Sequence, residues 1–512
     1  MNRIQLPLNA VTTDCASPEL RRRRTGLWPS RVWPILRYSS APRRTLIGAL
    51  ATGGIGAIVL GNPGIGYPIT ASALLVVVAC ARPERLTIWH RAGGLAVLAL
   101  SSVAVFRAAD WVVAMSVVSA VLLLGAVLAK SWSWTGLFLG ACAPILVPAR
   151  VVRWTVRGRA ALGSGGSHGI RAGRAAAVAM VTVVIVVVFA ALFAGADAAF
   201  ERILDAAIPE WDPDVAIGRM STFVLTTAGA LAYSYLAINR PRFDELSPPT
   251  KPSVRLWEWI IPVGALVALF GVFVAVQIAR LFGGQAHVQV TEGLTNAEYA
   301  RQGFWQLLAV TALTLLVIAV TIRKAPMESA SDRCALRGVL GLLCLLSLVV
   351  VASALHRMSL YEQQYGYTTL RLFVTAVELL LGSVFVLVMA AGIRMSGRRL
   401  PRAVGAGVVL TVLGLAMLDP DAYIAGHNVE RFEDTGKIDI GYLSQLSADA
   451  APELDRLPEP YRSCAMHATN TLDAHDGGDR QWFEYNVAES RARAMMPRSR
   501  MQACTALGVS VP

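Results

Sequence analysis

The sequence is poor in charge and in cysteine, and it carries no short motif of known chemistry. Only 16% of its 512 residues are charged, whereas soluble globular domains contain roughly 25%. Its 7 cysteines include no Cys-x-x-Cys pair and no Cys/His cluster, which argues against a zinc site. We therefore expect no metal and no cofactor. The absence of a catalytic motif favours a protein that is not an enzyme, although it leaves that question open.

Long apolar segments dominate the chain instead. Hydrophobic residues make up 55% of the sequence, and segments long enough to cross a bilayer recur between Thr45 and Leu418. The net charge of +13 comes largely from arginines beside these segments, where they contact lipid phosphates and set the orientation. We therefore predict an all-α integral membrane protein whose partner is the lipid bilayer, and no binding of nucleic acid.

The loops between the apolar segments alternate in charge, and this alternation predicts the orientation. Loops of one parity are rich in Arg and Lys, and such loops stay in the cytoplasm. The pattern predicts about eleven transmembrane helices in a bacterial cytoplasmic membrane, with the N-terminus cytoplasmic and the C-terminus extracytoplasmic. The predicted crossings are residues 45–60, 67–81, 92–106, 111–129, 175–194, 222–238, 259–281, 303–322, 340–355, 372–393 and 404–418.

Three parts follow from this topology. Residues 1–44 contain Pro, Ser and many Arg with little periodicity, which predicts a disordered basic cytoplasmic arm rather than a cleavable signal peptide. Residues 45–418 form a polytopic transmembrane domain. Residues 419–512 form a small helical domain outside the membrane, which we call the tail.

Residues 132–147 are apolar, but we expect them not to cross. Lys130 precedes this segment, and Arg150, Arg153 and Arg157 follow it, so a crossing would place a basic loop outside. The segment is also short. An interfacial or re-entrant segment is therefore favoured over a twelfth crossing.

Three polar stretches fall on the predicted outer side. The first contains Asp197 within the pattern of an amphipathic helix. In the second, Tyr361 and Tyr365 share a helical face, and Gly366 is placed to end the helix. Tyrosines at this depth are also common as membrane-interface anchors. The third stretch, residues 427–454, opens the tail.

These stretches resemble the bacterial multi-pass membrane proteins of the domain-of-unknown-function 4153/4173 family. The resemblance is carried by the Asp197 segment, by Tyr365-Gly366 with Leu370-Arg371, and by the tail from Asn428 to Leu454. It implies the same fold class and the same membrane location. It implies no catalytic role, because the family has no established activity.

Glu378 is an acid inside a predicted crossing. It lies seven residues after Arg371, about 10 Å along the helix and on the same face. A carboxylate at that depth needs a protein partner or water, and Arg371 and Arg280 are the candidates. Glu378 therefore either binds a proton or a ligand, or it forms a structural ion pair or hydrogen bond.

Cysteine placement predicts one disulfide bond. On the predicted topology only Cys464 and Cys504 lie outside, where an oxidising envelope permits a bond between them. Two cysteines in one small, thinly apolar domain are better explained as a pair than as two exposed thiols. We therefore predict a Cys464–Cys504 disulfide.

Three functions from different classes remain. The first is a scaffold or sensor whose tail binds an envelope protein or lipid. The second is a secondary transporter with an outward vestibule around Glu378, Arg371, Tyr361 and Tyr365, although no internal repeat supports it. The third is an enzyme similar to lipid-linked glycosyltransferases. The first outer loop, residues 61–66, contains no acidic residue, and this argues against such an enzyme. The oligomeric state is left open.

Overall fold

The computed structural model describes residues 40–82, 84–162, 213–246, 254–282, 304–327, 329–394, 397–467 and 481–495, with isolated positions between 182 and 202. Every regular element in these ranges is helical, so the predicted all-α class is confirmed. The predicted arm, residues 1–44, lies almost wholly outside the described residues.

Within the described residues, eight helices are long and apolar enough to cross a membrane. They are α5 (Ile88–Phe106), α6 (Asp110–Ala129), α12 (Pro213–Ile238), α13 (Leu256–Phe282), α16 (Phe304–Lys324), α17 (Ala330–Tyr365), α18 (Thr369–Arg394) and α19 (Leu400–Leu418). Each overlaps a predicted crossing, although α12 begins nine residues before its predicted crossing and α17 extends ten residues beyond its own at both ends.

The other three predicted crossings are residues 45–60, 67–81 and 175–194. Two of them form α3 (Arg43–Val59) and α4 (Gly66–Ala81), of 17 and 16 residues, whereas a straight crossing needs about 20. Most of residues 175–194 lies outside the described residues. The count of eleven therefore stays a prediction.

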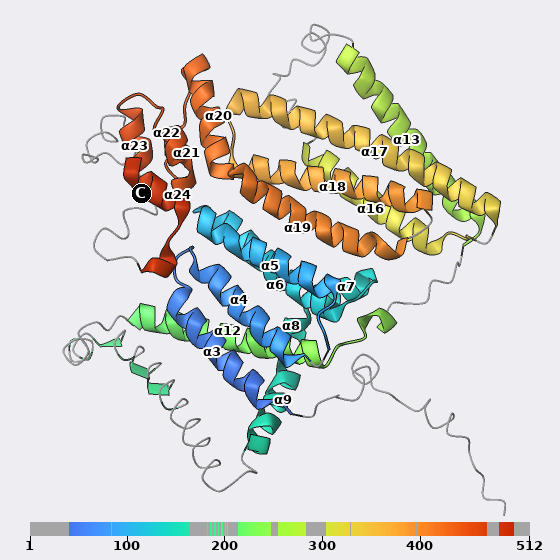
Figure 1. Cartoon of the computed structure of the whole chain (residues 1–512). Coiled ribbons are helices and arrows are strands. Elements are labelled where there is room, and N and C mark those ends of the chain that lie inside the picture. The colour runs from blue at the N-terminus through green and yellow to red at the C-terminus, as the bar shows by residue number, and fades with distance from the viewer. Residues whose placement is uncertain are drawn as a thin grey trace, which may run out of the picture.

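The helices lie side by side in one bundle (Figure 1). Helices α3, α4 and α12 form one flank, α5, α6 and α19 lie in the middle, and α13, α16, α17 and α18 form the other flank. Glycines allow α3 to approach α12 closely. A Cβ on Gly53 would lie 1.9 Å from Thr227 Oγ1, and one on Gly56 would lie 2.8 Å from Thr226 Cγ2. These glycines therefore serve helix packing.

The basic loops meet at one end of the bundle. There Arg240 Nε donates to the Ala129 carbonyl (3.1 Å), and Arg402 Nη2 donates to that of Lys130 (2.9 Å). The Asp244 carboxylate accepts from the backbone N–H groups of Trp132 and Ser133 (3.1 and 3.0 Å). The basic loops that the sequence predicts to lie on one side of the membrane thus share one end of the bundle.

Residues 132–147 enter and leave at this same basic end. They form α7 (Trp134–Ala141) and α8 (Ala143–Leu146), which are too short to cross. Helix α7 packs against α6 so closely that a Cβ on Gly125 would lie 2.6 Å from the Gly140 carbonyl oxygen. The next helix, α9 (Pro148–Leu162), accepts a 3.1 Å bond from Ala41 N–H at its Trp154 carbonyl. The re-entrant segment stays a prediction.

The tail covers the opposite end of the bundle (Figure 1). Its helices are α20 (Pro420–Thr435), α21 (Ile440–Leu443), η4 (Ala448–Ala450), α22 (Ala451–Leu454), α23 (Tyr461–His467), η5 (Trp482–Glu484) and α24 (Val487–Met495). Their buried core includes Ile424, Leu454 and Ala492, and it continues into Leu372 and Leu415 of the long helices. The tail therefore packs directly on the membrane helices.

Candidate functional site

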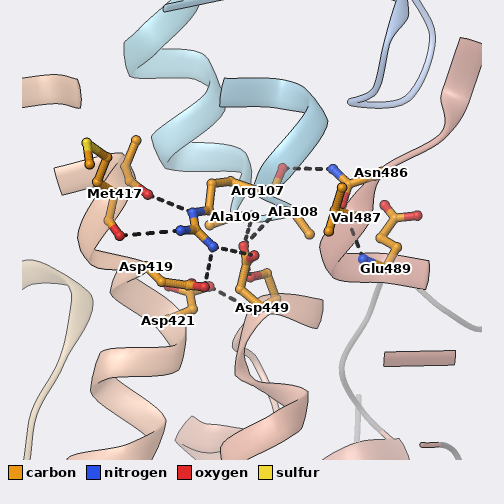
Figure 2. Close-up of polar contacts among 12 residues, drawn as sticks. Arg107, Ala108, Ala109, Met417, Asp419, Asp421, Asp449, Asn486, Val487 and Glu489 are labelled. Atoms are coloured by element: carbon orange, nitrogen blue, oxygen red, sulfur yellow. Dashed lines mark hydrogen bonds and ion pairs between the residues drawn. The ribbon is translucent and has the colours of Figure 1, made fainter. Parts of the chain in front are cut away.

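A three-residue loop, Arg107–Ala109, joins α5 to α6 beneath the tail and carries a half-buried arginine. Arg107 Nε donates to the Ala416 carbonyl (2.6 Å), and Nη2 donates to that of Met417 (3.4 Å). Nη1 forms an ion pair with Asp419 (Figure 2). The planar guanidinium thus binds the last carbonyls of α19, whose end favours positive charge.

Asp449 of η4 binds the same loop from the tail. Its side chain is 1% exposed, and its Oδ2 accepts bonds from the backbone N–H groups of Ala108 (2.7 Å) and Ala109 (2.9 Å). Its Oδ1 lies 3.8 Å from Arg107 Nη1 (Figure 2). Ala109 precedes α6 and cannot cap it, so Asp449 supplies the acceptor from a distant part of the chain.

Asn486 makes a third connection. Its Nδ2 donates to the carbonyls of Ala104 and Arg107, both at 2.9 Å, while its Oδ1 accepts from Glu489 N–H at 3.2 Å (Figure 2). Asn486 therefore begins α24 and fastens that helix to the end of α5. We call Arg107, Asp419, Asp449 and Asn486 the tail latch.

The latch brings carboxylates together around one guanidinium. Burial and the neighbouring Asp449 raise the pKa of Asp419 to about 7, while Arg107 opposes the shift. Burial also raises the pKa of Asp449, opposed first by its bonds to Ala108 and Ala109. Asp421 lies beside them and accepts from Trp111 Nε1 (3.3 Å) and Ser447 N–H (3.0 Å). The site can therefore gain or lose a proton near neutral pH.

No group of three or more His, Cys, Asp or Glu side chains within the described ranges could hold a metal ion. The acids of the latch are directed at N–H groups and at Arg107 instead. These contacts join the tail to the α5–α6 loop.

Three of the four residues predicted to line an outward vestibule, Arg371, Tyr361 and Tyr365, lie close together. The Arg371 guanidinium carbon lies 4.3 Å from the centroid of the Tyr361 ring, and the Tyr361 and Tyr365 rings are 4.8 Å apart. Arg371 also donates to the Gly366 carbonyl. Gly366 ends α17 with a φ of +85°, as its predicted role requires.

Glu378 is fully buried in α18 but does not join them. Its Oε1 accepts from Thr311 of α16 at 3.5 Å, and Oε2 has no hydrogen-bond partner among the described side chains. Arg371, the expected partner, is instead engaged with Tyr361 and Gly366. The side chain of Arg280, the other candidate, lies outside the described part. The vestibule that would unite all four residues stays a prediction.

The remaining predicted residues lie elsewhere. Asp197 is exposed, and its N–H donates to the Phe193 carbonyl (3.0 Å). Cys464 is completely buried in the tail. Cys504 lies outside the described residues, so the predicted disulfide stays a prediction.

Sequence reasoning missed the latch. No local spacing indicates that Asp419, Asp421 or Asp449 has a partner more than three hundred residues earlier in the chain. Arg107 did carry a signal, because it is an arginine in a predicted outer loop, and loops of that parity are otherwise poor in Arg and Lys. Such an exception to the charge rule is typical of a residue held by protein contacts.

Comparison with known proteins identifies a family. No curated protein matches the chain, and neither does any solved structure. The model of the family described as "Domain of unknown function (DUF4153)" matches residues 94–457. The match covers most of the long helices, the loop with Arg107, and the part of the tail that contains Asp419 and Asp449. The chain therefore belongs to the DUF4153 family.

Proposed function

We propose that this protein is a scaffold or sensor of the bacterial cytoplasmic membrane, and that its tail binds an envelope protein or lipid outside the cell. The observation that carries the proposal is the tail latch. Asp449 and Asn486 of the tail bind the backbone of the α5–α6 loop, and Arg107 binds the end of α19. A ligand that moves the tail would therefore move three membrane helices together.

The charge of the loops supports the orientation. Arg240 and Arg402 lie at the basic end of the bundle, which the positive-inside rule assigns to the cytoplasm. The tail lies at the opposite end (Figure 1). We therefore propose that the tail lies in the envelope.

The tail also offers side chains suited to a partner. Trp482 is 68% exposed and Tyr485 is 50% exposed, and both belong to the short segment around η5. Aromatic side chains of this kind are enriched at protein interfaces. The buried polar contacts of the latch fix where the tail attaches to the membrane helices and contribute less to the stability of the fold, as is found for some buried ion pairs.

The test is crosslinking at the tail surface in intact cells. A photoreactive residue replacing Tyr485 is expected to give a discrete adduct, and the same residue replacing Ile393, which is 75% exposed in α18, is expected not to give it. Asp449→Ala should weaken the adduct, whereas Asp449→Asn, which keeps an acceptor for both N–H groups, should preserve it. Equal adducts from both positions, or a tail that an impermeant thiol reagent cannot reach at Trp482→Cys, would contradict the proposal.

A secondary transporter is the second candidate, and the buried Glu378 favours it. The carboxyl is fully enclosed between α16 and α18, with one oxygen hydrogen-bonded to Thr311. Ionisable groups at such depth often carry protons in transporters. Proteoliposomes containing the wild-type protein should then move protons when a substrate gradient is applied, and Glu378→Gln should abolish this movement. A wild-type protein that moves no protons under any gradient tested would leave Glu378 a structural residue.

A further inference from the structure

A groove of about 320 Å³ lies beside the tail latch, where α5 and α19 meet α24. Its walls are mainly apolar and include Val103, Phe106, Leu413 and Met417. Val487 and Arg491 of α24 close the end nearest the tail. The groove therefore runs from two predicted membrane helices to a polar helix outside them.

The groove opens onto the surface that hydrocarbon would cover. Met417 is 81% exposed and Phe106 is 55% exposed, and both occupy the last turn of a predicted crossing. In a membrane such side chains face lipid chains, since water there would leave a large apolar surface exposed. An acyl chain is thus the occupant that the bilayer itself supplies.

The two arginines of the groove differ in what they already bind. Arg107 donates to two carbonyls of α19 and pairs with Asp419, so its charge is satisfied within the protein. Arg491 is exposed, and no ion pair to it is present among the described residues. An unengaged guanidinium at the polar end of an apolar groove fits a phosphate, which it binds through paired N–H donors.

We propose that this groove is a binding site for an anionic phospholipid, with one acyl chain between α5 and α19 and the headgroup phosphate on Arg491. A zwitterionic lipid fits less well, because its ammonium group would be brought close to the Arg491 guanidinium. The orientation proposed above decides which leaflet of the bilayer supplies the lipid, but the lipid binding itself does not depend on that orientation. Loss of lipid binding here would therefore leave an envelope protein as the proposed partner of the tail, and failure to find such a protein would leave this site untouched.

The test measures lipid retained by the full-length purified protein. The protein is placed in nanodiscs of phosphatidylcholine with a minor fraction of phosphatidylglycerol, and lipids that remain bound after detergent extraction are identified by native mass spectrometry. Wild type is expected to retain phosphatidylglycerol well above its share of the bilayer. Arg491→Gln should reduce this enrichment several-fold.

Two further variants control the experiment. Arg493→Gln removes the same charge from an exposed position on the same helix that does not line the groove, and it should retain lipid like wild type. Ala99→Trp fills the groove without changing charge and should also reduce retention. Equal retention of both lipids by wild type, equal loss in the two arginine variants, or full retention by Ala99→Trp would overturn the proposal. Thermal unfolding of each variant establishes that it is folded.

Discussion

The carboxylate of Asp449 accepts a 2.7 Å hydrogen bond from the backbone N–H of Ala108, across 341 positions of the chain. This bond makes the start of α6 depend on the tail, because the residue before the helix has no side-chain cap of its own. The α5–α6 hairpin and the tail are therefore expected to unfold as one cooperative unit.

Removing the acceptor at Asp449 should loosen the tail. Asp449→Ala leaves the N–H groups of Ala108 and Ala109 buried without a partner, at a cost of about 1–3 kcal/mol for each unsatisfied group. Hydrogen exchange of the α5–α6 loop and of α24 should then speed up, and the unfolding temperature should fall.

Another tail aspartate provides the control for this change. Asp455 pairs with Arg462 at the surface, with 39% of its side chain exposed. Asp455→Ala should therefore change stability by less than about 1 kcal/mol. Equal destabilisation by the two alanine variants would show that the Asp449 contacts stabilise the protein no more than an exposed ion pair does.

Stability should depend on pH through Asp419. Burial and Asp449 raise its folded pKa from 3.8 to about 7, so between these values the folded state holds a proton that the unfolded state has lost. The contribution of Asp419 to stability is then highest below about pH 4, falls as pH rises to about 7, and levels off above. The shift of Asp449 acts in the same direction.

Asp419→Asn isolates this effect. The amide cannot titrate, so the decline in unfolding temperature between pH 4 and 7 should become shallower than in wild type. Asp455→Asn, at the exposed pair with Arg462, should leave the decline as it is. A wild-type profile that rises with pH over this range would mean that Arg107 outweighs the burial of Asp419.

The contact between Glu378 and Thr311 can be measured with a double-mutant cycle. Glu378→Gln keeps an acceptor for the Thr311 hydroxyl and should fold like wild type. Glu378→Leu removes it and should cost about 1 kcal/mol. Thr311→Val should cost a similar amount, and the double variant should cost less than the sum. Strict additivity in the unfolding free energies would show that the two side chains do not interact.

The predicted Cys464–Cys504 bond would close a loop of about 40 residues, which is worth roughly 4 kcal/mol in the chain-entropy model. Peptide mapping of the non-reduced protein from native membranes should find the two cysteine peptides linked. Cys464→Ser and Cys504→Ser should destabilise the tail equally, and the double variant should add little. Finding both thiols free would show that the bond does not form, and it would weaken the case for an extracytoplasmic tail.

The re-entrant segment makes a topology prediction. If residues 132–147 do not cross, the basic loop after α9 is cytoplasmic, and a cysteine at Ser167 should be protected from an impermeant reagent in intact cells. A cysteine at Trp482 should react, since that side chain is exposed in the tail. Labelling of the Ser167 cysteine from outside would show that residues 132–147 cross the membrane as a twelfth helix.

The sequence alone predicted which segments become the long helices, because a crossing needs only a local run of apolar residues of sufficient length. It also predicted the end of α17 at Gly366, since a positive φ favours glycine. The prediction that residues 132–147 do not cross rests on Lys130 before the segment and on the arginines after it. The close pairing of Tyr361 with Tyr365 followed from helical spacing.

Only the tertiary structure decided which polar groups meet across the chain. Glu378 faces Thr311 rather than Arg371, because the rotation of α18 against α16 sets the direction of that side chain. Asp449 caps a helix that begins more than three hundred residues earlier, and Arg107 closes the end of α19. Apolar length and flanking charge are properties of a short segment, so the sequence determined them. The choice among several buried donors and acceptors depends on how the whole bundle packs, and no local pattern encodes it.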